Sequence, residues 1–122
     1  MAHCRNAGYQ VAVAVVDRSG VPQVLLRDRL AGAHTVDVAA QKAWTAASVK
    51  TSTSAFAAET QPGKPMSGLR GQARFMAVAG GLMIEAGGSL LGGIGVSGAP
   101  GGDADEACAA AGLKAIADDL EF

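Results

Sequence analysis

The stretch LMIEAGGSLLGGIGVSG, residues 82–98, decides the fold of this sequence. An apolar segment over residues 82–86 is followed by Gly87-Gly88 and then by a second apolar segment over residues 89–96. Two glycines between two apolar runs are a strong signal for a two-residue β-hairpin turn. The stretch therefore predicts two adjacent antiparallel strands, and we expect the remaining strands to join the same antiparallel sheet.

The end of this stretch, GIGVSG at residues 93–98, has the Gly-x-Gly-x-x-Gly spacing of a dinucleotide-binding turn. That turn requires a helix beginning at the third glycine and a second parallel strand ending in an acidic residue about 20 positions later. Here four residues, 99–102, separate Gly98 from the next expected helix, and no second strand follows. We expect no nucleotide. Gly93 and Gly95 instead fall inside a strand, where a missing side chain lets another group approach closely.

The first half of the chain predicts a hairpin and a helix. Residues 10–17 and 22–29 are apolar and rich in valine and leucine, and Gly20 provides the turn between them. Residues 35–49 predict a helix capped by Thr35. Its small apolar face consists of Val36, Ala40, Ala43 and Ala47. Trp44 lies off this face and is expected to fill a second contact, at a core edge or a subunit surface.

The second half adds four further segments. They are a short helix at 51–60, an irregular loop at 61–72, a strand at 75–79 and a closing helix at 103–120. Asp103 and Glu106 have the spacing of a capping box for this last helix. Because the strands occur in hairpins and do not alternate with helices, the sequence predicts an α+β fold with an antiparallel five-stranded sheet flanked by helices.

Length and charge exclude several classes of protein. At 122 residues the chain is expected to form a single domain over residues 1–122. A net charge of −1 without a basic stripe argues against nucleic acid or an anionic membrane as a partner. The core is rich in alanine and glycine and is therefore thin, so we expect a homo-oligomer.

The ends and the cysteines of the chain bear on its location. No apolar run approaches the roughly 20 residues needed to span a bilayer, and no hydrophobic signal segment opens the chain. Cys4 and Cys108 are solitary and far apart in sequence, which indicates reduced, buried thiols in a cytoplasmic protein. Because strand-like sequence already begins at Gln10, an opening helix is expected to be largely absent.

Several short motifs together resemble the GlcG/HbpS-like family, which also includes the C-terminal domain of PduO-type proteins. The matching segments are Val15-Val16-Asp17 with Gly20, Lys42-Ala43-Trp44-Thr45-Ala46, Gly80-Gly81-Leu82, residues 92–98 and Asp105-Glu106-Ala107-Cys108. Each motif is weak alone, but their order and spacing over residues 10–117 are specific. One position departs from the family, because Ala31 stands where the family usually has an aspartate.

This resemblance implies a profilin-like antiparallel sheet flanked by helices, and assembly into dimers or larger oligomers. It also implies haem or a related tetrapyrrole as a ligand, since some members of the family bind haem. His3 is then the first candidate for the haem iron and His34 the second, since a neutral imidazole is an ordinary axial ligand. For both histidines the competing interpretation is a solvated residue, in a frayed terminus for His3 and in a loop for His34.

Four further residues are candidate ligand-binding positions: Arg29, Lys42, Gly80 and Gly81. The cations of Arg29 and Lys42 would pair with haem propionates or with another carboxylate. The alternatives are a surface charge for Arg29 and a lysine with a structural hydrogen bond for Lys42. Asp105 and Glu106 are explained by their place in the first turn of a helix, where negative charge is stabilising.

The sequence holds no nucleophile–base pattern, no paired carboxylates and no closed zinc motif, so an enzyme is the less favoured interpretation. Three functions remain open. The first is an oligomeric haem- or tetrapyrrole-binding protein. The second is an accessory protein or enzyme for a small organic carboxylate, with Lys42 and the Gly80-Gly81 bend lining a pocket between subunits. The third is a structural or regulatory assembly module without a small ligand.

Overall fold

The centre of the fold is an antiparallel sheet built around the expected hairpin. In the computed structural model, which describes residues 1–120, the strand order is β2-β1-β4-β3 and every neighbouring pair is antiparallel. The strands are β1 (Ala12–Asp17), β2 (Pro22–Arg27), β3 (Gly81–Ala86) and β4 (Ser89–Ser97). Both predicted hairpins are present, with Gly20 and Gly87-Gly88 at positive φ in their turns.

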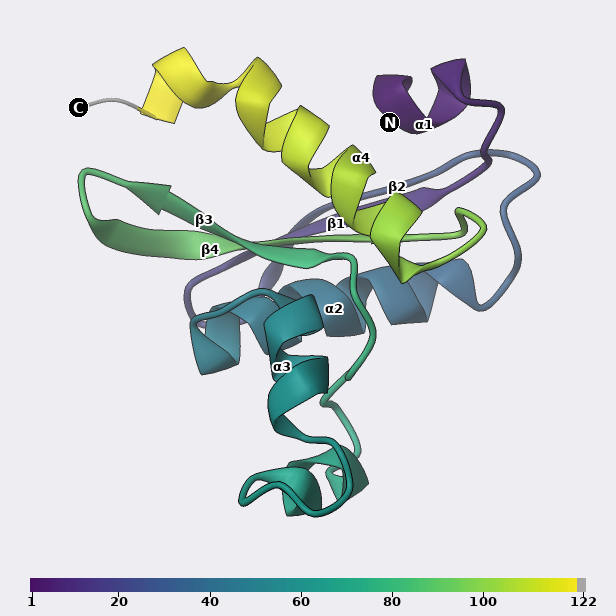
Figure 1. The fold of residues 1–122 in the computed structure, drawn as a ribbon. Helices are drawn as coiled ribbons and strands as arrows, with labels where there is room; N and C mark the ends of the chain where they lie inside the picture. Colours follow the sequence, from purple (N-terminus) through teal and green to yellow (C-terminus); the bar gives the residue numbers. More distant parts are fainter. Residues whose placement is uncertain (121–122) are drawn as a thin grey trace.

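Helices cover both faces of this sheet. They are α1 (Ala2–Asn6), α2 (Thr35–Val49), α3 (Thr53–Glu59) and α4 (Gly102–Ala115), with 3-10 turns η1 (Ser67–Gly71) and η2 (Ala117–Leu120). Helices α1 and α4 lie on one face and α2 on the other, while α3 and the segment after it project away from the sheet (Figure 1). The α+β prediction is confirmed. Among residues 1–120, no helix is both long and apolar enough to cross a membrane.

The expected strand at residues 75–79 is wrong, and within residues 1–120 the sheet has four strands, not five. Phe75 packs its ring against Trp44, with ring centroids 5.2 Å apart, and against Phe56 at 5.4 Å. The amide of Met76 donates to Thr45 Oγ1 at 2.9 Å. Phe75, which looked like part of a buried strand, therefore joins an aromatic cluster with α2 and α3. The backbone of Met76 is bonded to a side chain of α2 and not to a neighbouring strand.

Helix α2 lies unusually close to β4, because β4 has glycines where the two meet. A Cβ atom added at Gly93 would collide with the carbonyl oxygen of Ala43, and one at Gly95 with that of Ala39. Ala39 and Ala43 are fully buried, so small residues face each other from both sides. This explains the glycine-rich turn-like motif: its first two glycines are contact points for a helix. The expected alanine face is present, although its buried members also include Ala39 and Ala46.

Helix α1 is tied to α4 by a disulfide between Cys4 and Cys108, whose Cα atoms are 5.6 Å apart. Both residues belong to the apolar cluster between the sheet and α4. The prediction of reduced thiols is therefore wrong. The argument for a cytoplasmic location that rested on those thiols is removed with it, because disulfides persist mainly in oxidising compartments.

A buried carboxylate, that of Asp28, holds the same helix from the other side. It accepts hydrogen bonds from Arg5 Nε at 2.7 Å and from the amide of Val11 at 2.9 Å. Burial raises the pKa of Asp28, but the bonds from Val11 and Arg5 and the guanidinium charge together hold that pKa below its ordinary value. Asp28 thus joins α1, the start of β1 and the end of β2.

The close contact of α2 with β4 predicts a strong effect of one methyl group. We expect Gly95→Ala to lower the free energy of unfolding by at least about 2 kcal/mol, because the helix backbone must move to admit a Cβ. Gly68→Ala is the matched control, since a Cβ there meets nothing within 4 Å. Urea unfolding measures both variants, and equal stabilities for them would contradict the close contact.

Candidate functional site

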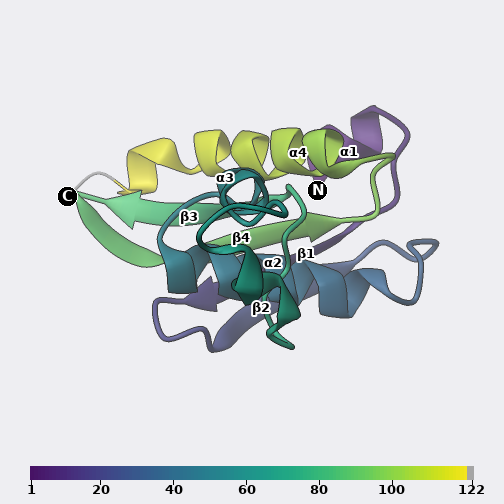
Figure 2. The ribbon, with the colours of Figure 1, turned by 60° about the horizontal axis from the view of Figure 1, so that its bottom comes forward.

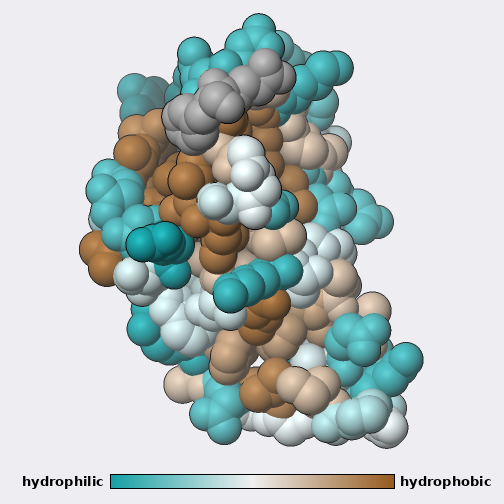
Figure 3. Space-filling model, turned by 90° about the vertical axis from the view of Figure 1, so that its left-hand side faces the viewer, coloured by the Kyte–Doolittle hydropathy of each residue, from teal (hydrophilic) through white to brown (hydrophobic). Residues whose placement is uncertain are grey.

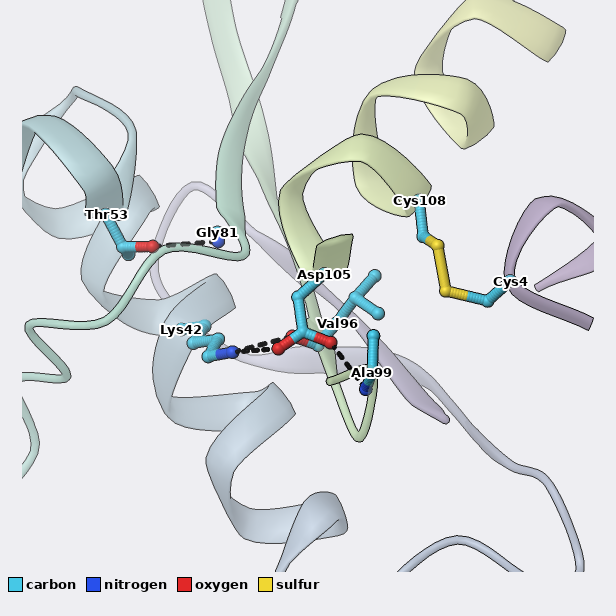
Figure 4. A network of polar contacts seen from close by, with 8 residues as sticks. All are labelled: Cys4, Lys42, Thr53, Gly81, Val96, Ala99, Asp105 and Cys108. Carbon is cyan, nitrogen blue, oxygen red and sulfur yellow. Dashed lines mark hydrogen bonds and ion pairs between the residues drawn. A yellow bond between two sulfur atoms is a disulfide. The ribbon is translucent and has the colours of Figure 1, made fainter. Parts of the chain in front are cut away.

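The ammonium group of Lys42 is buried at the point where α2, β4 and α4 meet. Only 1% of the residue is exposed. Its Nζ atom donates to the carbonyl oxygen of Val96, at the end of β4, at 2.9 Å and to Asp105 Oδ2, in the first turn of α4, at 2.8 Å. Figure 4 shows these groups pointing toward one another from three elements. The sequence allowed two interpretations of Lys42, a ligand contact or a structural hydrogen bond. In the structure Lys42 has a buried partner of opposite charge.

Asp105 also fixes the loop that leads into α4. Its second oxygen, Oδ1, accepts from the amide of Ala99 at 2.9 Å, so one carboxylate holds both Lys42 and the loop after β4. The capping box expected from Asp103 and Glu106 is wrong. The helix begins at Gly102 after Gly101 without a side-chain cap. The ion pair of Asp105 with Lys42 was not predicted, because the position of Asp105 in the first turn of a helix already accounted for its negative charge. Lys42 is also 63 residues away in the sequence, so no local pattern links the two.

Gly80 and Gly81 lie against Lys42 from the other side. A Cβ at Gly80 would come within 2.7 Å of Lys42 Nζ, and one at Gly81 would collide with the Lys42 carbonyl oxygen. The amide of Gly81 donates to Thr53 Oγ1 at 2.8 Å, which links the start of β3 to α3. The glycine pair therefore allows the chain to pass close to the lysine.

A pocket of about 450 Å³ opens beside this ion pair. His34, the residue before α2, lies in its wall together with Lys42 and Asp105. The remaining lining residues are small or apolar: Gly32, Thr35, Val38, Val78 and residues 97–102. The imidazole of His34 lies over Gly32, where an added Cβ would be 2.7 Å from its Cε1 atom. The structure thus brings together one predicted histidine and the predicted lysine.

The other predicted site residues do not line this pocket. Arg29 is exposed in the turn after β2, and His3 is exposed on α1, next to the disulfide. Gly80 and Gly81 contact Lys42 but are not among the residues that line the pocket. Among the described residues, no group of three or more His, Cys, Asp or Glu side chains is placed to hold a metal ion.

A second hollow, of about 500 Å³, lies between the β3–β4 hairpin and the end of α4. Figure 3 shows hydrophobic side chains gathered on this end of the molecule. Its lining includes Met83, Leu113 and Leu120, and within residues 1–120 the one charged lining residue is Glu85. Its described lining residues include neither an imidazole nor a cation, so the pocket beside Lys42 is the better candidate for a polar or metal-containing ligand.

The fold and the pocket define a small α+β domain in which an anchored, glycine-rich loop closes a ligand-sized hollow. The chain belongs to the HbpS-like family, described as "Haem degrading protein HbpS-like", which it matches over residues 1–114. The resemblance inferred from its motifs is therefore confirmed.

Two solved structures have a similar fold. A double mutant of HbpS from Streptomyces reticuli is 39% identical, with a TM-score of 0.86 over 93% of this chain and 75% of the other. A PduOC–haem complex is 31% identical, with a TM-score of 0.90 over 94% and 84%. The corrinoid adenosyltransferase PduO of Citrobacter freundii is 36% identical over 90 residues, which are 72% of this chain but only 27% of that protein.

The buried ion pair predicts strong coupling between its two members. We expect Lys42→Met or Asp105→Asn alone to lower the free energy of unfolding by about 3–5 kcal/mol, because each leaves a buried partner without its counterpart. The double variant should lose less than the sum of the two. Urea unfolding of all four proteins gives the coupling energy, and additive losses would show that the two side chains act independently.

Proposed function

We propose that this chain is a ligand-binding domain for haem or a related tetrapyrrole, held in the pocket beside the Lys42–Asp105 pair. The observation that carries the proposal is the place of His34, at the wall of a hollow of about 450 Å³. Hollows of about 300–1,000 Å³ hold small ligands and cofactors in other proteins. A PduOC–haem complex among the similar structures supports the same class of ligand.

The residues of the pocket fit such a group. An imidazole is an ordinary ligand of haem iron, and His34 is exposed and therefore accessible. Val38 and Val78 offer apolar contact, and Gly101, where an added Cβ would meet nothing within 4 Å, leaves the backbone open to a flat ring. Arg29 precedes His34 by five residues in the same loop and remains the candidate partner for a propionate. When bound, haem would supply redox or ligand-binding chemistry.

The two histidines give separable expectations for a hemin titration. We expect wild type to show a saturable shift of the Soret band. His34→Ala should weaken binding at least tenfold, whereas His3→Ala, outside the pocket, should leave it unchanged. Gly32→Ala should weaken binding as well, because its methyl group displaces the imidazole.

Two results would count against the haem proposal. A wild-type protein without a saturable Soret shift would refute haem binding. A shift that is unchanged when both histidines are replaced would refute ligation by either of them.

A small organic carboxylate is the second candidate ligand, favoured by a different observation. The N-terminal ends of α2 and α4 both reach the pocket, with His34 and Gly101 preceding their first turns. Helix N-termini attract anions through their free amides and dipoles.

Thermal shift measurements distinguish this candidate from haem. We expect a carboxylate ligand to raise the Tm at concentrations well above its Kd, and this rise should persist in His34→Ala. A broad panel of organic acids that leaves the Tm unchanged would exclude it.

We also propose that the protein acts as a homo-oligomer. Within residues 1–120, alanine supplies half of the buried apolar residues, and several large apolar side chains remain exposed. Both features are typical of chains that gain stability from subunit contacts.

A further inference from the structure

Strand β2 is exposed along its entire length although most of it is apolar. All six residues, Pro22–Arg27, are exposed. Val24 and Leu25 are each 46% exposed and Leu26 is 51% exposed, and Val21 and Leu30 beside the strand are 51% and 77% exposed. Scattered apolar residues are normal on a protein surface, but three consecutive exposed apolar residues on an edge strand leave both faces of that edge apolar and open to pairing.

Helix α2 reaches this strand from one face of the sheet, but helix α4 on the other face does not extend over it. Helix α4 packs on β4 and β3, and Figure 2 shows β2 at the edge of the sheet farthest from α4. Val24 and Leu26 are paired with Val15 and Val13 of β1, whose side chains belong to the apolar layer on the α4 side. Val24 and Leu26 therefore extend the apolar layer beneath α4 to the edge of the sheet, where α4 does not reach.

The opposite edge of the sheet is protected. In β3, Ile84 and Ala86 are buried, the first residue is tied to α3 through Thr53, and the exposed position carries a charge, Glu85. Natural proteins commonly protect sheet edges with such devices. The contrast shows that β2 lacks a cover that the other edge has.

The backbone of β2 also has groups that point away from the sheet. The amide of Asp28 donates to Val11, so by the alternation of an antiparallel ladder residues 26 and 24 point toward β1. Leu25 and Arg27 then direct their amides and carbonyls outward. Neither residue is proline, so both can pair with another strand.

We propose that β2 is covered by β2 of a second copy of this chain, in an antiparallel two-fold contact. The inference rests on the proposal that the protein is a homo-oligomer, and it names the surface. A two-fold contact uses the same edge twice, so Val24 and Leu26 of the two copies lie together on one face of the joined sheet and Leu25 on the other.

Charge favours the antiparallel orientation. Arg27 and Arg29 lie at one end of the exposed strand, and Asp17 and Arg18 lie in the turn at its other end. A parallel contact would bring the arginines of two copies together. An antiparallel contact places them beside the turn in the partner, where the opposite charges of Asp17 and Arg18 cancel. The net charge of −1 leaves little repulsion between whole molecules.

Sedimentation of the full chain over a concentration series tests this surface. We expect Leu26→Lys to weaken self-association at least tenfold, because a charge would be buried at the centre of the contact. Leu91→Lys is the matched control, since Leu91 is 39% exposed on β4 and lies outside the patch. Val24→Lys provides a second test of the same patch, and circular dichroism establishes that each variant is folded.

The outcomes separate this inference from the proposals on which it rests. Weaker association in the β2 variants alone supports the contact. Wild-type association that both β2 variants retain would overturn the surface but leave the homo-oligomer. A wild type that stays monomeric up to about 1 mM would overturn both, and another occupant would cover β2. The hemin titration is independent of all three results.

Discussion

One buried charge organises this molecule. The ammonium group of Lys42 has almost no contact with water, and an isolated charge in such a position is costly. It is stabilised because the Val96 carbonyl and the Asp105 carboxylate lie within 2.9 Å of it. Those partners belong to the end of β4 and the start of α4, so the requirement to satisfy one lysine fixes the loop between them. That loop forms much of the wall of the candidate pocket.

The glycines of β4 make this arrangement sterically feasible. Gly93 and Gly95 let α2 lie directly on the strand, and Gly80 leaves space beside the end of the Lys42 side chain. The same segment resembles a nucleotide-binding turn by spacing alone. Its physical role is the close packing of a helix on a strand. The candidate pocket is lined by the residues at its end and just after it, 97–102.

Local patterns predicted the helix at residues 35–49 and both hairpins, because periodicity and turn chemistry act over a few residues. The expected strand at residues 75–79 was wrong because aromatic packing between distant segments decides its conformation. The same limit applies to the site. The motifs identified Lys42, but neither its bond to Asp105 nor the Cys4–Cys108 disulfide has a local signal, since their partners are 63 and 104 residues apart.

Amide hydrogen exchange at Ala99 in Lys42→Met tests most directly whether Lys42 fixes the loop between β4 and α4. Lys42 keeps the Asp105 carboxylate in place to accept from this amide. Beyond the loss that global destabilisation causes, we expect the protection of Ala99 to fall at least tenfold more than that of the amide of Val11, which is bonded to the distant Asp28. Unchanged protection at Ala99, or an equal loss at both amides, would contradict the claim that Lys42 organises this loop.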